Sequence, residues 1–413
     1  ASGAGVPGQT PIVAGWPVAF SADGRKLAAH DPRGNVCEPA SGGTACRPGA
    51  GVLRLVDLPG WREAAVAALP AAGWVGPVVF SPDASRVALV ENDRERSTLV
   101  VVDSASGAVL GERPLAPGFR PSLLAYRDDG AALVLYGQPL GDDPGMTRPG
   151  PPRVVLVDAA TLELRWEQPL PELLAGDWCH ESCQASHERR LFASWAPAVV
   201  PARDGRALYA VHADADRLTT VDLQARAVRT VEIRTERPWL ERLLGLVVQV
   251  AEAKGGAEGA RKAAVLSADG ARLYVTGSAI HSEPDPGEVW RVTQTALGVQ
   301  AVELPGGRRA GAAPVEGSGA ALIAAAPSGA YLLLRGWEPG DVWTEVLEAR
   351  GLGRVARLVG WEVVVGRRLD GQPVVQASRT GQQESQLAVL DPGSFEVVRS
   401  WSVAANASWL GSP

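Results

Sequence analysis

The sequence of 413 residues contains little lysine, methionine or asparagine. Lysine occurs only at Lys26, Lys254 and Lys262, and the single methionine is Met146. Asparagine occurs only at Asn35, Asn92 and Asn406. Almost every basic residue is therefore an arginine, which is typical of a GC-rich genome. Scarcity of asparagine and methionine is also typical of proteins from hot habitats, so a thermophilic bacterial source is the alternative interpretation.

The chain also lacks a cluster of basic residues and a long apolar run. Its formal net charge is -6, and no run of Lys or Arg is present that would follow a phosphate backbone or an anionic membrane surface. The longest apolar run, Leu243 to Ala251, is much shorter than the roughly 20 residues of a membrane-spanning helix. We therefore expect no nucleic-acid partner and no membrane span.

Familiar catalytic and cofactor motifs are missing as well. The sequence contains no G-x-S-x-G, no H-E-x-x-H, no P-loop and no C-x-x-C-H. A single G-x-G-x-x-G pattern, Gly3 to Gly8, includes Pro7 and does not open a helix, so it does not predict a dinucleotide site. We assign no catalytic residue and expect no cofactor.

A repeat organises most of the chain instead. An apolar run, a turn of the type S-x-D-G and a second apolar run, as in "PVAFSADGRKLAAH", occur seven times. The copies begin at Pro17, Pro77, Leu123, Ala198, Ala263, Leu322 and Val363. A third run that mostly ends in Asp and a more polar fourth run follow, as in "LVVVDSASGAVLGERPL".

Four short strands with tight turns, repeated seven times, predict seven four-stranded antiparallel sheets. One such sheet cannot bury both faces alone, and sheets stacked in a ring leave only short edges. The predicted fold is an all-β, seven-bladed β-propeller that forms one domain, residues 1–413. The approximate blades are 16–72, 73–116, 117–176, 177–233, 234–304, 305–360 and 361–413.

The repeat resembles a known family. "SADGARLYVTGS" from Ser267 and "STLVVVDSASGAVLGERPL" from Ser97 are similar to the YVTN-type propeller repeat, which is related to WD40 repeats. The resemblance extends from about Trp16 to Val403. It implies the propeller fold and is common in bacterial extracytoplasmic proteins, but it does not specify a function.

The long segments between strands fall on one face of the predicted ring. They are residues 30–50, 137–152, 168–194, 234–262, 279–288 and 305–318. We expect these insertions to form a recognition surface, because loops carry function more often than the scaffold does; neutral drift is the alternative. Residues 237–256 have Pro238 at the start and Gly255 at the end of a predicted helix, and Trp239 lies on its apolar side, packed on the propeller or open to a partner.

An aromatic residue precedes the first strand of several blades on the same face. These residues are Trp16, Trp74, Phe119, Trp195 and Trp361. They are placed to form an aromatic collar at the channel mouth, or to stack between neighbouring blades.

The four cysteines lie in two insertions. Cys37 and Cys46 belong to the first blade, and Cys179 and Cys183 precede the fourth. Local spacing predicts two disulfides, Cys37–Cys46 and Cys179–Cys183, because cross-pairing would span the channel. A zinc site at Cys179, Cys183 and His187 is the alternative. An even cysteine count without a leftover thiol predicts an extracytoplasmic location, whether secreted, periplasmic or on the cell surface.

Together these features predict a non-catalytic propeller that binds a protein or cell-envelope partner through its insertion face. One alternative is a structural subunit of a surface layer or filament, which would self-associate. Another is a propeller lactonase or lyase with its site at the channel mouth. The predicted innermost runs, such as "GPVVF", "KAAVL" and "LIAAA", contain almost no His, Asp or Glu, and this favours the non-catalytic interpretation.

Overall fold

A computed structural model gives the architecture of the chain. It describes residues 18–31, 35–40, 43–48, 51–57, 62–69, 74–92, 96–139, 151–180, 191–235, 257–285, 288–316, 320–326, 328–338, 341–367, 373–379, 384–391 and 394–404. Regular structure in these residues consists of β-strands joined by turns. No helix among them is long and apolar enough to cross a membrane.

The strands form four-stranded antiparallel sheets, which we name blades 1 to 7 in chain order. Blade 1 contains β1 (Val18–Phe20), β2 (Lys26–Asp31), β5 (Val52–Asp57) and β6 (Arg62–Ala68). Blade 2 contains β7 (Trp74–Phe80), β8 (Arg86–Asn92), β9 (Ser97–Asp103) and β10 (Val109–Pro114). Blade 3 contains β11 (Phe119–Tyr126), β12 (Ala132–Pro139), β13 (Arg153–Asp158) and β14 (Leu164–Pro169).

The remaining blades follow the same order. Blade 4 contains β17 (Ala198–Pro201), β18 (Ala207–Val211), β19 (Arg217–Asp222) and β20 (Ala227–Glu232). Blade 5 contains β22 (Ala257–Leu266), β23 (Arg272–Asp285), β25 (Val299–Glu303) and β26 (Arg308–Ala313). Blade 6 contains β27 (Ala320–Ala325), β28 (Tyr331–Glu338), β29 (Asp341–Glu348) and β30 (Arg354–Val359). Blade 7 contains β31 (Glu362–Arg367), β32 (Pro373–Arg379), β33 (Glu384–Leu390) and β34 (Val397–Ala404).

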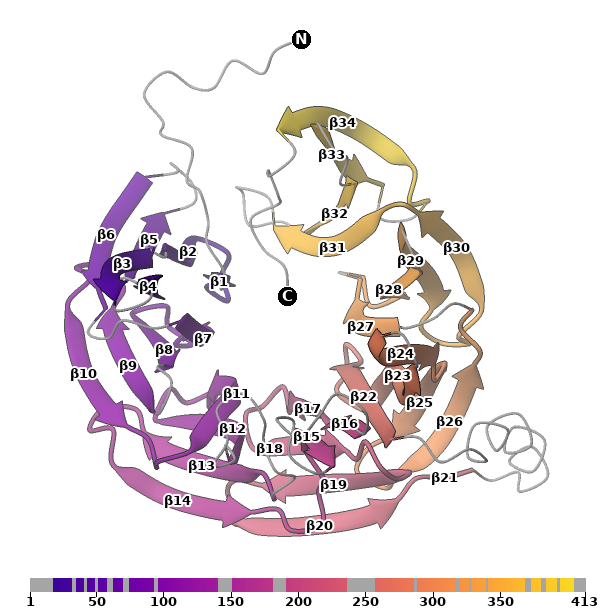
Figure 1. The fold of residues 1–413 in the computed structure, drawn as a ribbon, viewed down its shortest axis with the longest axis horizontal. Helices are drawn as coiled ribbons and strands as arrows, with labels where there is room; N and C mark the ends of the chain where they lie inside the picture. Colours follow the sequence, from indigo (N-terminus) through magenta and orange to yellow (C-terminus); the bar gives the residue numbers. More distant parts are fainter. Residues whose placement is uncertain are drawn as a thin grey trace.

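The blades are arranged around a central axis, with the first strand of each blade innermost and the fourth on the circumference (Figure 1). The prediction of a β-propeller with four-stranded antiparallel blades is confirmed. Within the described residues the chain supplies seven such units, of which blade 5 is part of a larger sheet.

The turn between the first two strands of a blade is stabilised by a serine and an aspartate. Ser21 Oγ donates to Asp23 Oδ1 (2.6 Å) and accepts from the backbone N–H of Lys26 (2.9 Å). The same contacts recur around Ser81 in blade 2 and Ser267 in blade 5. The hydrogen bond from Ser21 is the main reason that the pKa of Asp23 lies below its usual range. The recurring S-x-D sequence therefore supplies the hydrogen bonds that stabilise this turn.

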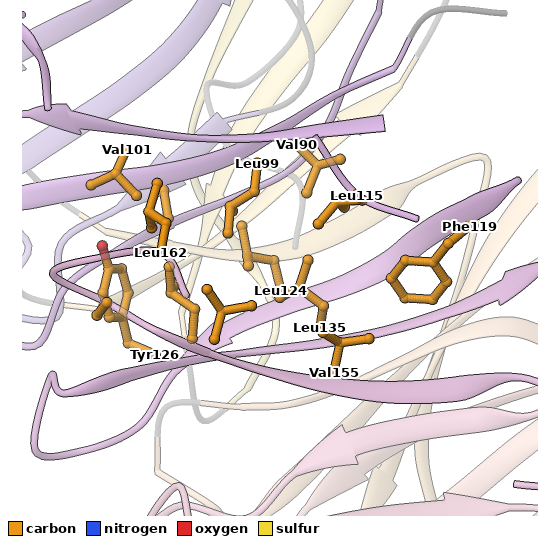
Figure 2. Close-up of a cluster of buried hydrophobic side chains, with 14 residues drawn as sticks. Val90, Leu99, Val101, Leu115, Phe119, Leu124, Tyr126, Leu135, Val155 and Leu162 are labelled. Atoms are coloured by element: carbon orange, nitrogen blue, oxygen red, sulfur yellow. The ribbon is translucent and has the colours of Figure 1, made fainter. Parts of the chain in front are cut away.

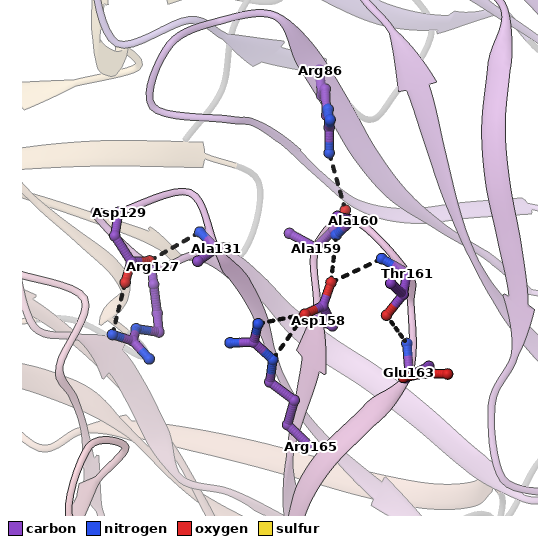
Figure 3. Close-up of polar contacts among 10 residues, drawn as sticks. All are labelled: Arg86, Arg127, Asp129, Ala131, Asp158, Ala159, Ala160, Thr161, Glu163 and Arg165. Atoms are coloured by element: carbon purple, nitrogen blue, oxygen red, sulfur yellow. Dashed lines mark hydrogen bonds and ion pairs between the residues drawn. The ribbon is translucent and has the colours of Figure 1, made fainter.

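The turn between the third and fourth strands is built around an acidic residue, as blade 3 shows (Figure 3). Asp158 Oδ1 accepts from the backbone N–H groups of Ala160 and Thr161 (2.8 Å each), and Arg165 binds Oδ2. The hydrogen bonds from Thr161 and Ala160 are the main reasons that the pKa of Asp158 falls to about 2. Four residues after the aspartate, Leu162 has a φ of 57° and donates its N–H to Asp158 O (2.9 Å).

A left-handed residue recurs at this position in other blades, and in several it helps to join them. The equivalent positions are Gly107, Leu162, Arg226, Gly307, Leu352 and Phe395. Leu162, Leu352 and Phe395 are buried, and each packs into a core cluster shared with the preceding blade. Figure 2 shows Leu162 of blade 3 beside Val101 and Leu99 of blade 2. Burial of one such side chain contributes about 1.5–3 kcal/mol to the stability of the fold. The turn residue therefore also stabilises the contact between adjacent blades.

Hydrogen bonds also connect neighbouring blades. Lys26 Nζ of blade 1 donates to Ser104 Oγ of blade 2 (2.8 Å), and Arg86 of blade 2 donates to the carbonyl oxygen of Ala159 in blade 3 (3.3 Å, Figure 3). Both basic residues open the second strand of their blade, and both reach the third-to-fourth turn of the next one. The blades are therefore joined by an equivalent contact at two successive boundaries.

The prediction of one insertion is wrong. The sequence predicts an insertion at 305–318 and a border between the fifth and sixth blades after 304, whereas the structure places β26 there. This strand pairs with β25 and is the outer strand of blade 5. Its sequence, "RRAGAA", has no β-branched or aromatic residue, whereas each of the other outer strands has at least one, which explains why the repeat pattern misses it.

Other predicted insertions contain strands rather than irregular loops. Residues 30–50 include a hairpin of β3 (Asn35–Ala40) and β4 (Gly43–Pro48). Residues 168–194 include most of β15 (Gly176–His180) and β16 (Leu191–Ala196), and residues 279–288 lead into β24 (Glu288–Ala296). The predicted helix, residues 237–256, lies outside the described residues.

Candidate functional site

Strands from three of the predicted insertions, residues 168–194, 234–262 and 279–288, lie in one sheet with blade 5. β15 pairs antiparallel with β16, and β16 pairs in parallel with β22, the inner strand of blade 5. β22 pairs with β23, and the distal half of β23 pairs with β24. We call the five-stranded unit β15-β16-β22-β23-β24 the raised sheet. It is part of the eight-stranded sheet that contains blade 5 (Figure 1). Its strands β15, β16 and β24 are additional to the four strands of a blade.

The pairing of β16 with β22 depends on a close backbone approach. Trp195 lies opposite Ala260, and Ala196 lies opposite Arg261. A side chain added at Gly259 would collide with the backbone of Ser194, so glycine permits this approach. Arg261 Nε donates to Ser194 Oγ (3.1 Å), and Ser194 is fully buried. The raised sheet is therefore fixed to blade 5 by side chains as well as by backbone pairing.

A second parallel pair joins the same two blades at the circumference. β21 (Arg234–Thr235) follows the outer strand of blade 4 and pairs with β26 of blade 5. The backbone N–H of Arg234 also donates to Gly307 O (3.1 Å). The strands that directly precede and follow blade 4, β16 and β21, are thus paired with the inner and outer strands of blade 5.

Polar and charged residues gather where blade 4 meets blade 5. We call this group of residues the blade 4–5 junction. Its members are His212, Asp214, Asp216, Arg217, Lys262 and Arg309. Arg309 Nη2 donates to Asp216 Oδ2 (2.7 Å), while Lys262 Nζ lies 4.0 Å from Asp216 Oδ1. Lys262 Nζ also donates to the carbonyl oxygen of Ala215 (3.3 Å). The connection between β18 and β19 of blade 4 is thereby held against inner and outer strands of blade 5.

His212 is fully buried at this junction. Its Nε2 shares a hydrogen bond with Thr219 Oγ1 (2.7 Å), which in turn lies 2.9 Å from Thr230 Oγ1. Its Nδ1 lies 3.9 Å from Asp214 Oδ1, beyond hydrogen-bond distance. Burial is the main reason that the pKa of His212 falls to about 4, and the nearby Arg217 lowers it further. The imidazole is therefore neutral near neutral pH.

Lys262 is the most deeply buried cation of the junction, with 11% of its side chain exposed. Burial lowers the pKa of its amine, and Asp216 and Asp214 partly oppose that effect. A lysine amine with a lowered pKa on an inner propeller strand is suited to bind an anion or to act on a carbonyl group.

The predicted aromatic residues do not share one environment. Phe119 is 2% exposed in the core between blades 2 and 3, with the Arg153 guanidinium 5.8 Å from its ring centroid. Trp195 is half-buried in the raised sheet, and Trp361 is half-buried against the core of blades 6 and 7. Trp74 begins β7. Trp16 and Trp239 lie outside the described residues. Packing between blades accounts for Phe119 and Trp361.

The backbone places one predicted cysteine pair face to face. Cys37 of β3 lies directly opposite Cys46 of β4. Cys179 lies in β15 opposite Phe192, while Cys183 and His187 lie outside the described residues. The second disulfide and the zinc alternative therefore remain predictions. In the part of the chain that the structure describes, no group of three or more His, Cys, Asp or Glu side chains is arranged to hold a metal ion.

The sequence does not predict the junction. Lys262 opens the innermost run "KAAVL", which is otherwise apolar. Asp214 and Asp216 occur in "HADADR", a short connection without a motif. The signal that points to Lys262 is a lysine within an innermost run of a chain that has only three lysines.

Two clefts open on the opposite face, where the serine-aspartate turns lie. One, of about 710 Å3, lies between blades 5 and 6 and is lined by Tyr274 and Tyr331 among others. The second, of about 660 Å3, lies between blades 1 and 2 around Lys26. Its carboxylates include Asp83 and Asp103, which accept hydrogen bonds within their own turns. These acids therefore have a structural role.

Comparison with known proteins gives likeness in structure but not in sequence. No protein-family model matches the chain, and no curated protein sequence matches it. The dihydro-heme d1 dehydrogenase NirN is 15% identical with a TM-score of 0.44, over 86% of this chain and 71% of that one. The periplasmic gluconolactonase PpgL of Pseudomonas aeruginosa is 16% identical with a TM-score of 0.47, over 83% of each chain. With so few identical residues, neither likeness assigns an activity to this chain.

Proposed function

We propose that the protein is a single-domain, extracytoplasmic binding propeller of the YVTN type, which recognises a protein or cell-envelope partner through the raised sheet. The observation that carries this proposal is the pairing of three insertions, distant in sequence, into one sheet. Insertions that drift without constraint have no reason to pair with each other. An ordered surface beyond the needs of the ring indicates selection for recognition.

The raised sheet also has the chemistry of a recognition surface. β15 and β24 are its edge strands, and each has one described neighbour, β16 and β23 respectively. An edge strand presents backbone N–H and C=O groups that pair with an extended segment of a partner. The protein scaffold supplies rigidity through the Arg261–Ser194 contact.

The proposal is tested by shortening the β23–β24 ribbon. Ser282 lies opposite Val292, so replacing residues 283–291 with Asn-Gly leaves a two-residue hairpin turn. The matched control replaces residues 38–45 of the β3–β4 hairpin in the same way. We expect immobilised wild-type protein and the control to retain a partner from an envelope extract of the source cells, and the ribbon variant to lose it. Equal retention by all three proteins would contradict the proposal.

A lactonase or lyase is the second candidate, and Lys262 is the observation that favours it. A buried lysine on an inner strand, whose pKa is lowered by burial, is the type of group that serves as a base or a nucleophile in enzyme sites. The test is hydrolysis of a panel of five- and six-membered lactones by wild-type protein and by Lys262→Gln. Turnover that disappears in the variant, with the fold retained, would establish catalysis in place of simple binding.

A further inference from the structure

The blade 4–5 junction contains polar groups whose hydrogen-bonding capacity is not used. Lys262 Nζ has three donors, but its single hydrogen bond among the described residues is the 3.3 Å contact with Ala215 O. Asp216 lies 4.0 Å away and does not bond to it. A buried ammonium group with one long hydrogen bond is costly, because its hydration is lost without replacement.

Arg217, at the start of β19 in blade 4, is more exposed than Lys262, and its ion pair is also longer than a hydrogen bond. Its Nη2 lies 3.7 Å from Asp214 Oδ2, and no closer polar contact of its guanidinium group occurs within the described residues. His212 Nδ1, buried between these groups, likewise has no hydrogen-bond partner among them. Three nitrogen atoms of the junction, Arg217 Nη2, Lys262 Nζ and His212 Nδ1, thus have no hydrogen bond to a side chain within the described residues.

The charge of the junction has a definite sign. Arg217, Lys262 and Arg309 are cationic, while Asp214 and Asp216 are anionic and His212 is neutral. Counted over these six residues, the positive charges exceed the negative charges by one, and the Glu172 carboxylate also acts on His212. Arg309 already bonds to Asp216, which leaves Lys262 and Arg217 as the cations with donors available.

We propose that Lys262 and Arg217 form a binding site for an anionic group, a carboxylate or a phosphate monoester, at the blade 4–5 junction. The anion accepts hydrogen bonds from Lys262 Nζ and the Arg217 guanidinium, and His212 supplies a third polar contact through Nδ1. Asp214 and Asp216 limit the site to a single anionic group, because a second one would face their carboxylates. This inference goes beyond the proposed function, since the anion can bind whether or not a partner docks on the raised sheet.

The site is tested by calorimetric titration of the full chain with inorganic phosphate and with acetate at constant ionic strength. The variants are Lys262→Gln and Arg217→Gln, with Lys26→Gln as the matched control on blade 1. We expect saturable binding that weakens at least about tenfold in each junction variant, which corresponds to the loss of one charged hydrogen bond. The control should bind as the wild type does.

The outcomes are distinct for each anion and each variant. Binding of phosphate alone would assign a phosphate monoester, and binding of acetate as well would extend the class to carboxylates. Absence of saturable binding of either anion, or unchanged affinity in Arg217→Gln, would overturn the proposal. Arg217 is the partly exposed member of the pair, so its variant keeps the test valid if Lys262→Gln does not fold. Partner retention by the same variants separates this inference from the proposed function.

Discussion

Leu162 occupies the space that the missing side chain of Gly111 leaves on the outer strand of the preceding blade. A methyl group added at Gly111 would lie 3.1 Å from Leu162 Cδ1. The same relationship recurs between Gly311 and Leu352, where the distance is 3.6 Å. The left-handed turn of one blade is thus fitted to a glycine on its neighbour.

This fit predicts coupled effects on stability. We expect Gly111→Ala to destabilise the protein by about 1–3 kcal/mol through overpacking, and Leu162→Ala by about 2–4 kcal/mol through the cavity it leaves. In the double variant the added methyl enters that cavity, so the two effects should not add. Denaturant unfolding measures each free energy. Gly306→Ala is the control, because no atom lies within 4 Å of a methyl group added there, and simple additivity in the cycle would contradict the packing argument.

A second prediction concerns pH and His212. The folded-state pKa of about 4 lies below the ordinary value of 6.5, so protonation favours the unfolded chain. The stability that the neutral imidazole contributes is complete above pH 6.5 and is lost as the pH falls to about 4. The shift corresponds to about 3 kcal/mol.

Thermal unfolding across this pH range checks the prediction. The wild-type protein should lose stability as the pH falls from 6.5 to 4, and His212→Gln should show a flatter dependence from a lower starting value. His281→Gln, in β23, is the control and should follow the wild-type slope. An unchanged slope in His212→Gln would show that other groups dominate the acid response.

The cysteines give a third prediction. Cα atoms of directly opposed residues in antiparallel strands lie about 4.5–5.5 Å apart, which is within the range that a disulfide spans. Cys37 and Cys46 are such a pair. Intact-mass measurement with and without reductant should therefore show two disulfides, and peptide mapping should place one between these two residues. Free thiols at Cys37 and Cys46 in protein from an oxidising compartment would contradict it.

A buried hydroxyl group between blades 6 and 7 gives the fourth prediction. Thr344 Oγ1 donates to Trp361 O (2.9 Å) and accepts from the backbone N–H of Val363 (3.0 Å), and Thr344 is fully buried. Thr344→Val keeps the shape but leaves both backbone groups without a partner, so we expect a loss of about 1–3 kcal/mol.

Denaturant unfolding and amide hydrogen exchange measure this loss. Exchange of the Val363 amide should accelerate together with the drop in stability. Thr98→Val, at a half-buried position of β9, is the control and should change the stability little. A Thr344→Val protein as stable as the wild type would show that the hydroxyl contributes nothing to the contact between these blades.

The local parts of the fold were predictable because their causes are local. Ser21, Asp23 and Gly24 determine a turn through hydrogen bonds within four residues, and alternating apolar residues determine the strands beside it. β26 escaped prediction because its sequence is rich in alanine and arginine. The pairing of β16 with β22, and the meeting of Asp216 with Lys262, depend on how two blades approach each other, for which a short sequence window contains no signal.

The parallel pairing of β16 with β22 also bears on how the chain folds as it is synthesised. β16 ends at Ala196, while β22 begins at Ala257, so the ribosome completes blade 4 well before the partner of β16 exists. Domains made from the N-terminus onward bury such edges only when the later segment emerges. β16, which leads into the fourth blade, therefore lacks its β22 partner until the fifth blade is made, and the raised sheet forms only then.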